Sequence, residues 1–304
     1  LTLAARIFGS DSVLYGSSSS WTALLKPPDE RLATAAPATA MLALAIVFPL
    51  FLVVGAIPSR LGQMFALALP QVLLLNIFVF LIVFVAVPLL IIRLSNVSLS
   101  SALSLNTRVP FAALVAALLF GISLWPVLYE LNLVVGIASR AESLQRMLET
   151  LVDDLEKTPL IIKLTALAFA PALCEELFFR GFLQTSLRQR YSATITIAAT
   201  AILFGLFHIV VRDSLFLERM IPSTLMGIIL GTMLERSGSV FPGMLLHAVH
   251  NGLLLCVVHY KTQLEQLGIG LEQRSHLPPI WLAGGIGLAI LGGLILCRTR
   301  PVSS

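Results

Sequence analysis

The stretch MFALALPQVLLLNIFVFLIVFVAVPLLII, residues 64–92, decides the fold because it contains no charged residue over 29 positions. A helix of about 20 apolar residues is long enough to cross the hydrocarbon core of a bilayer. Seven further apolar runs occupy residues 41–57, 110–137, 159–178, 193–211, 221–234, 240–259 and 279–297. The sequence therefore predicts an all-α polytopic integral membrane bundle of about eight transmembrane helices.

The composition indicates the same class of protein. Hydrophobic residues make up 57% of the 304 residues and charged residues only 12%, about half of the charged share in soluble domains. Mean hydropathy is +0.94. These values exclude a water-soluble globule, and the alternating ten-residue pattern of a membrane β-barrel is missing from the sequence.

The net charge of +4 comes from basic residues that are scattered singly over loops. Because they form no patch or stripe, we expect no nucleic-acid partner. Loops on one side of the expected spans carry ten Lys and Arg residues, and loops on the other side carry eight. This difference favours cytoplasmic termini. We expect a multi-pass protein of the bacterial cytoplasmic (inner) membrane, surrounded by the lipid bilayer.

Residues 140–157 (RAESLQRMLETLVDDLEK) have leucine and methionine at helical spacing, with acids and bases between them. This pattern predicts an amphipathic helix that lies outside the membrane. Such a helix connects two spans at the interface or gates the approach of a substrate.

The first group of embedded ionisable residues is CEELFFR, from Cys174 to Arg180. A charge near the bilayer centre costs about 2.5–3.5 kcal/mol on insertion scales, so such residues indicate functional sites. Glu176 and Arg180 are four residues apart and share a helix face, whereas Glu175 is turned about 100° away. We therefore expect one paired glutamate and one that is free to act as a base, with a structural ion pair at a helix end as the alternative.

Two further groups are FGLFH, which ends in His208, and HAVHN, which runs from His247 to Asn251. His208 alone is more typical of a hydrogen-bonded histidine than of a ligand. His247 and Asn251 share one helix face and His250 flanks them, which is hard to explain as packing in lipid. With the first group they supply a carboxylate, imidazoles, an amide and a guanidinium, which suits hydrolysis or a metal site. The sequence contains neither H-E-x-x-H nor G-x-S-x-G.

The order E-E-x-x-x-R, F-x-x-x-H and H-x-x-x-N on successive apolar helices resembles the CPBP intramembrane proteases. These are the CAAX proteases and bacteriocin-processing enzymes, also called Abi or lysostaphin-resistance-protein-A-like. Three motifs in this order are specific, although each alone is weak. The resemblance covers roughly residues 159–260 as motif core. It implies a protease domain at 63–304 with a conical polar cavity among the helices.

Carried over residue by residue, the resemblance implies that Glu175 is the catalytic base for a water molecule and that His208 assists it. Glu176 and Arg180 would shape the site.

The same resemblance implies that His247 and Asn251 stabilise the oxyanion. In the metalloprotease interpretation of the family, Glu175, His208 and His247 would form a metal site, so Zn²⁺ is a conditional expectation.

We therefore expect an intramembrane endopeptidase that acts on membrane-associated peptides or proteins, such as a prenylated protein or a leader peptide. The alternative is a non-catalytic transporter subunit or ion-coupled carrier that uses the same buried Glu and His residues. Peptide cleavage would support the first function, and ion-dependent flux without cleavage would support the second.

Residues 1–62 are expected to form a lead-in and the first transmembrane helix. The stretches AARIF at 4–8 and DSVLYG at 11–16 resemble the junction in fusions of an ABC-transporter permease with a CPBP domain. Because the chain begins with Leu1, we expect that a permease half lies upstream or was lost, with an ABC transporter component as a partner.

Overall fold

The computed structural model describes residues 31–105, 108–134, 155, 157–211, 214–215, 219–266 and 276–299. The stretches at 4–8 and 11–16, and all of the predicted amphipathic helix at 140–157 except residues 155 and 157, lie outside the described residues. The domain boundary between residues 62 and 63 stays a prediction.

All eight apolar runs form mainly helix in the described residues, which confirms the all-α bundle, and the run 193–211 ends in a two-residue strand. Labels η mark π-helical segments. In chain order the elements are α4 (Pro37–Val54), α5 (Ile57–Phe65), α6 (Leu69–Phe80), η1 (Leu81–Ala86), α7 (Val87–Leu94), α8 (Leu99–Ala102), α9 (Phe111–Val134), α11 (Leu160–Leu164), η2 (Thr165–Phe169), α12 (Ala170–Glu176), η3 (Leu177–Gln184), α13 (Thr185–Leu187), α14 (Ala193–Ile209), β1 (Val210–Val211), β2 (Ser214–Leu215), α15 (Met220–Ser237), α16 (Phe241–His259), α17 (Lys261–Gln266) and α18 (Pro279–Arg298).

Five helical stretches are long and apolar enough to cross a membrane: Pro37–Phe65, Leu69–Leu94, Phe111–Leu131, Phe241–His259 and Pro279–Arg298. Ala193–Ile209 is a shorter apolar helix. The other two of the eight runs are α15 and the helical run from α11 to α13. That run carries Lys163, Glu175, Glu176 and Arg180, and these charges lower its hydropathy.

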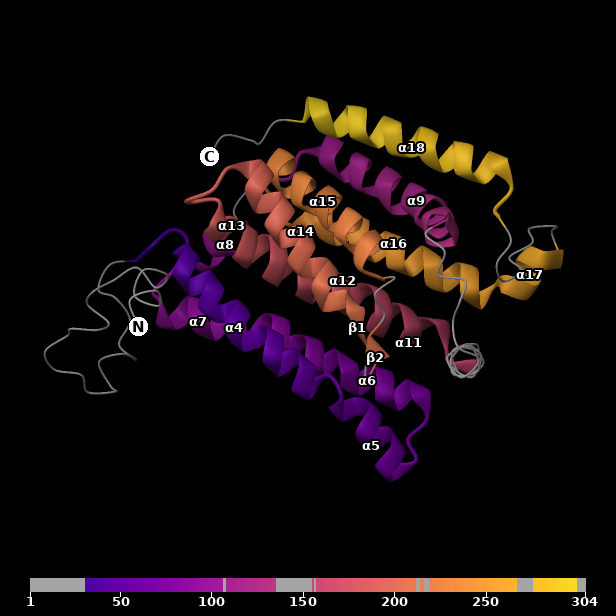
Figure 1. Ribbon diagram of the computed structural model, residues 1–304, viewed down its shortest axis with the longest axis horizontal. Coiled ribbons are helices and arrows are strands. Elements are labelled where there is room, and N and C mark those ends of the chain that lie inside the picture. Colours follow the sequence, from indigo (N-terminus) through magenta and orange to yellow (C-terminus); the bar gives the residue numbers. More distant parts are fainter. Residues whose placement is uncertain are drawn as a thin grey trace, which may run out of the picture.

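The helices that carry the motifs lie in the middle of the bundle. α12 and η2 pack on α16, α14 packs on α15, and α9 packs on both α16 and α18. Figure 1 shows α18 outside α9 on one face, and α4 to α7 on the opposite face. Elements on both faces therefore shield the motif helices from lipid.

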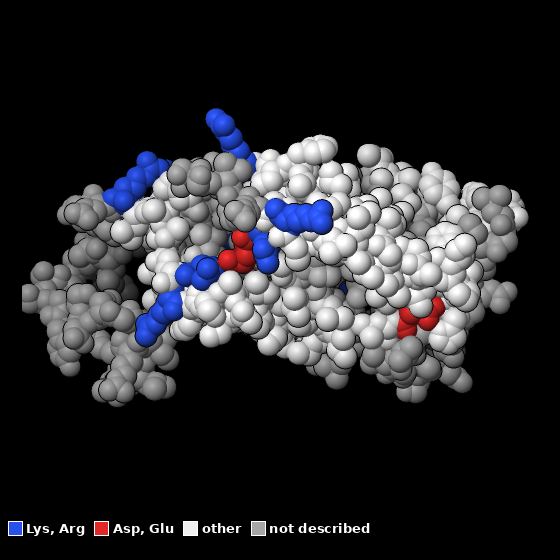
Figure 2. Space-filling view, turned by 90° about the horizontal axis from the view of Figure 1, so that it is seen from above, with Lys and Arg blue, Asp and Glu red and all other residues white. Residues whose placement is uncertain are grey.

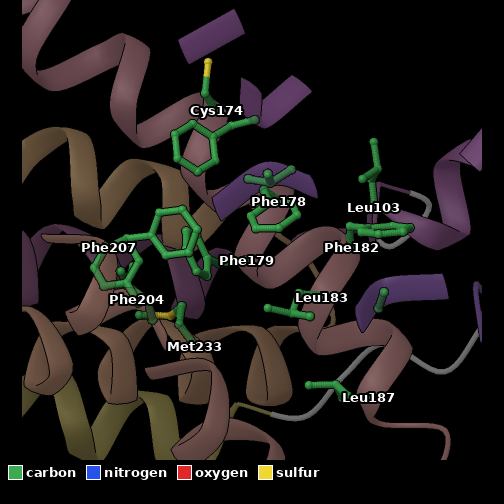
Figure 3. Close-up of a cluster of buried hydrophobic side chains, with 14 of the residues drawn as sticks. Leu103, Cys174, Phe178, Phe179, Phe182, Leu183, Leu187, Phe204, Phe207 and Met233 are labelled. Atoms are coloured by element: carbon green, nitrogen blue, oxygen red, sulfur yellow. The ribbon is translucent and has the colours of Figure 1, made fainter. Parts of the chain in front are cut away.

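Phenylalanine side chains form the core between α4, η1, α12 to η3, and α14. Phe179 makes edge-to-face contacts with Phe178, Phe204 and Phe207, at centroid distances of 5.1 to 5.2 Å. Phe84 adds contacts from η1 to Phe178 and Phe207. Figure 3 shows Phe179, Phe204 and Phe207 facing one another beside Met233. Such ring pairs add about 0.5–1.5 kcal/mol each to simple burial, so the cluster fixes α14 against the helix that carries both glutamates.

Hydrogen bonds join several loops and helix ends at one end of the bundle. Ser98 N–H donates to the Leu32 carbonyl, Val240 N–H donates to the Ser104 carbonyl, and Arg236 reaches the Cys297 carbonyl. Figure 2 shows the Lys and Arg side chains mainly over the half of the molecule that holds this end. We call the end of the bundle that these hydrogen bonds join the arginine-rich end. Its charge fits the predicted topology, in which this end faces the cytoplasm.

Glu130 joins the end of α9 to the start of α18. Its carboxylate accepts hydrogen bonds from His276 at 2.7 Å and from Leu277 N–H at 2.6 Å. Lys163 donates to His259 Nδ1 at 2.7 Å, and this contact joins α11 to the end of α16. Both pairs lie outside the clustered motifs and tie helix ends together.

Alanine at position 227 should separate α14 from α15. A Cβ on Gly227 would lie 2.8 Å from Cα of Ala201, which is backbone and cannot move aside alone. We expect Gly227→Ala to lower the free energy of unfolding by about 1–3 kcal/mol, the usual cost of overpacking. Thermal unfolding of the detergent-purified protein measures this effect.

Gly284→Ala is the matched control, because a Cβ there meets no atom within 4 Å. It should change stability by less than about 0.5 kcal/mol. Equal melting curves for the two variants would contradict the close packing of α14 on α15.

Candidate active site

The sealed part of the site is an ion pair between Glu176 and Arg180. Arg180 Nη1 donates to Glu176 Oε1 at 2.8 Å, and Nη2 donates to the Gly227 carbonyl at 3.3 Å. The side chains are 1% and 0% exposed for arginine and glutamate. The structure thus contains the predicted i, i+4 pair, placed where α12 passes into the π-helical segment η3. π-Helical turns occur frequently at functional sites.

Glu175, one residue earlier, points to a different neighbour. Its Oε2 lies 3.8 Å from His208 Nε2, too far for a direct hydrogen bond, and finds no hydrogen-bond partner among the described residues. His208 Nδ1 lies 2.8 Å from the Phe204 carbonyl. Because a carbonyl only accepts, Nδ1 carries the proton, and in the neutral ring Nε2 is a lone-pair acceptor that faces Glu175.

His247 and Asn251 approach from α16. His247 Nδ1 donates to Glu176 Oε1 at 3.3 Å, and Asn251 Nδ2 donates to the Leu167 carbonyl at 3.4 Å. These two hydrogen bonds hold the face of α16 that carries His247 and Asn251 against the helical run that carries the glutamates. His250 is buried beside them, and its Nδ1 has no hydrogen-bond partner among the described residues.

Phe204 links the three motif groups. Its ring centroid lies 4.3 Å from the Arg180 guanidinium carbon, 4.3 Å from the His208 ring and 5.8 Å from the His247 ring. A cation over an aromatic face is attracted by the quadrupole of the ring. The F-x-x-x-H spacing therefore serves two purposes: the Phe204 carbonyl orients His208, and its ring supports Arg180.

The helix α15 contributes contacts to the site that the sequence motifs do not predict. Arg180 donates to the Gly227 carbonyl and Gln184 to the Gly231 carbonyl, while Glu235 accepts from both Gln184 and Arg188. The donors and the acceptors each advance by four residues, so two helices run side by side in register. The G-x-x-x-G spacing at 227–231 was the signal, because small residues let helices approach closely.

Access to the site narrows from His208 inward. The exposed fraction of the side chain is 23% for His208, 9% for Glu175 and 0% for Glu176. Arg219, at the start of α15, acts electrostatically on both Glu175 and His208. The glutamate that is free of an ion pair therefore lies next to His208, the most exposed of the three side chains, and we call the side of His208 the accessible side of the site.

A cavity of about 490 Å³ lies between α6, η1, η2, α12 and α16, beside the site. It is lined mostly by apolar side chains and includes Cys174 and Ala248, the neighbours of Glu175 and His247. None of the six candidate side chains lines it, so the conical polar cavity stays a prediction.

A zinc site requires at least three donor side chains that converge on one point. Among the described residues, no three His, Cys, Asp or Glu side chains are placed to hold a metal ion. His247 Nδ1 is directed at Glu176, whereas His208 faces Glu175. In this arrangement Glu175, His208 and His247 do not fit a zinc ion. The proposed mechanism therefore uses none.

Residues 157–253 match the family model for type II CAAX prenyl endopeptidase Rce1-like proteins. The match covers about a third of the chain and contains Glu175, Glu176, Arg180, His208, His247 and Asn251. It confirms the resemblance to the CPBP proteases, while the permease fusion stays a prediction. Comparisons with curated proteins and with solved structures gave no match.

The match and the apolar helices together indicate an integral membrane protein. The Rce1-like family consists of CAAX endopeptidases of the membrane, which supports the prediction of an endopeptidase.

Removing the Arg180 charge should destabilise the fold strongly, because Glu176 is left buried and unpaired. We expect Arg180→Met to cost about 3–5 kcal/mol, as for other broken buried ion pairs. The double variant Glu176→Gln/Arg180→Met removes both charges and should recover most of that loss. Thermal unfolding of both variants measures the difference, and equal stabilities would argue against the ion pair.

Proposed function

We propose that the protein is an intramembrane endopeptidase in which Glu175 activates a water molecule. The observation that carries the proposal is the pair of acceptors formed by Glu175 Oε2 and His208 Nε2, 3.8 Å apart and on the accessible side of the site. A water molecule has two hydrogens, and two acceptors at this spacing bind both. The oxygen lone pair of the water is then directed toward the substrate.

In the first step the water oxygen attacks the scissile carbonyl carbon while Glu175 takes one proton. The electron pair of the carbonyl moves to its oxygen, which becomes an oxyanion. In the second step this pair returns, the C–N bond breaks, and the leaving amine takes the proton from Glu175. Glu175 thus accepts a proton in the first step and donates it in the second, as general acid–base catalysis requires.

The oxyanion needs donors that are already in place. Asn251 Nδ2 has two hydrogens and gives one to the Leu167 carbonyl, so the second is available. His247 donates through Nδ1 to Glu176.

The proposed substrate is a membrane-associated polypeptide, because the site lies among apolar helices and beside an apolar cavity. A prenylated peptide and a leader peptide both have this chemistry. We also propose a bacterial cytoplasmic membrane with the arginine-rich end inside, on the charge distribution described above.

Glu175→Gln should lower kcat by about 10²–10⁴-fold, the usual contribution of a positioned base. Glutamine keeps the size of the side chain but accepts no proton. The measurement is cleavage of a panel of quenched fluorescent peptides, including a prenylated one and a leader peptide, by detergent-purified protein.

Glu130→Gln is the control, since this carboxylate lies at the end of α9 and binds His276 and Leu277. It should keep activity within about threefold. Full activity of Glu175→Gln would refute the mechanism, and ion flux into proteoliposomes without cleavage would favour a carrier.

A chelator separates water activated by a carboxylate from water activated by a metal. We expect cleavage to survive 1,10-phenanthroline, because the three conditional ligands do not converge. Loss of activity that added Zn²⁺ restores would instead assign a zinc site to this protein.

A further inference from the structure

Two residues after His208 the chain changes from helix to strand, since α14 ends at Ile209 and β1 begins at Val210. β1 and β2 pair in antiparallel register, Val210 with Leu215 and Val211 with Ser214. Among the described residues the sheet has two strands, so each strand has an outer edge that no other described strand covers. Figure 1 shows this hairpin at the end of α14 that lies away from α13.

The position of the hairpin along α14 places it inside the membrane. α14 begins at Ala193, just after Arg188 and Arg190 at the arginine-rich end, and its rise of 1.5 Å per residue puts His208 about 22 Å further on. The hydrocarbon core is about 30 Å thick. The hairpin therefore begins before the far surface is reached, at the level of the two glutamates.

An open strand edge at this depth is tolerated only where it lines a water-filled space or is covered by polypeptide. His208, two residues before β1, is 23% exposed. The edge and the accessible side of the site are therefore neighbours.

We propose that the outer edge of β1 binds the substrate as an added strand, so that the polypeptide to be cut passes His208 in an extended conformation. Adjacent strands lie about 4.7–4.9 Å apart, and Val210 Cα is within about 7 Å of His208 Cα. A chain paired with β1 therefore passes near Glu175. β1 is favoured over β2 because it continues directly from His208. The inference rests on the proposed function and adds how the substrate is recognised: by its backbone N–H and C=O groups.

The first test is an N-methyl scan of the peptide that the protein cleaves best. In a paired strand only every second residue directs its N–H at the neighbouring strand. We expect kcat/KM to fall at least about fivefold at alternate positions around the cut, the cost of a lost hydrogen bond with added crowding. A flat profile, or losses without alternation, would overturn the inference while leaving the protease intact.

The second test needs no cleavage. In a Glu175→Gln background with Cys174, Cys256 and Cys297 changed to alanine, Val211→Cys should form disulfides with peptide cysteines placed two residues apart. Ser214→Cys, at the residue that pairs with Val211 on the strand further away, is the matched comparison and should crosslink at least about fivefold less. Crosslinks from Ser214→Cys alone, or at every peptide position equally, would refute pairing with β1.

Failure of the proposed protease function and failure of strand pairing would give different results. If no peptide in the panel is cleaved, the proposed function fails, and crosslinking with the same peptides still decides whether β1 pairs with an extended chain.

Discussion

The Arg180–Glu176 ion pair is the contact on which the rest of the site depends. Two charges that are 1% and 0% exposed in a membrane bundle persist only if each is neutralised and hydrogen-bonded. The Gly227 carbonyl supplies a further acceptor, the Phe204 ring covers the guanidinium, and His247 donates to the same carboxylate oxygen. Satisfying this one pair therefore brings α14, α15 and α16 together around α12.

The close approach of α15 follows from the same requirement. Arg180 reaches a backbone carbonyl at position 227 only because no side chain there keeps the helices apart. Gly243 on α16 works in the same way, since a Cβ would lie 3.0 Å from Glu176 Oε2. In lipid, where apolar contact alone gives helices little reason to associate, such glycines and hydrogen bonds determine which helices pack together.

Most of the fold could be predicted from the sequence, because apolar runs such as 64–92 must be helical in a bilayer. The Glu176–Arg180 pair could be predicted as well, since their i, i+4 spacing is local. The contacts of His247 with Glu176 and of Asn251 with the Leu167 carbonyl could not, because they join segments more than 70 residues apart. The hairpin after His208 could not be predicted from the sequence either, since an apolar run that ends in two valines predicts a longer helix.

The neighbouring glutamates differ because the helix turns about 100° between them. That rotation places Glu176 against Arg180 and His247, where it is sealed, and leaves Glu175 toward His208, on the accessible side. A carboxylate that is 0% exposed cannot act as a base for hydrolysis, because neither water nor substrate reaches it. An unpaired carboxylate beside an acceptor imidazole can take a proton from water. The proposed division of roles thus follows from helix geometry: the buried pair holds the helices together, and the second glutamate is the proposed base.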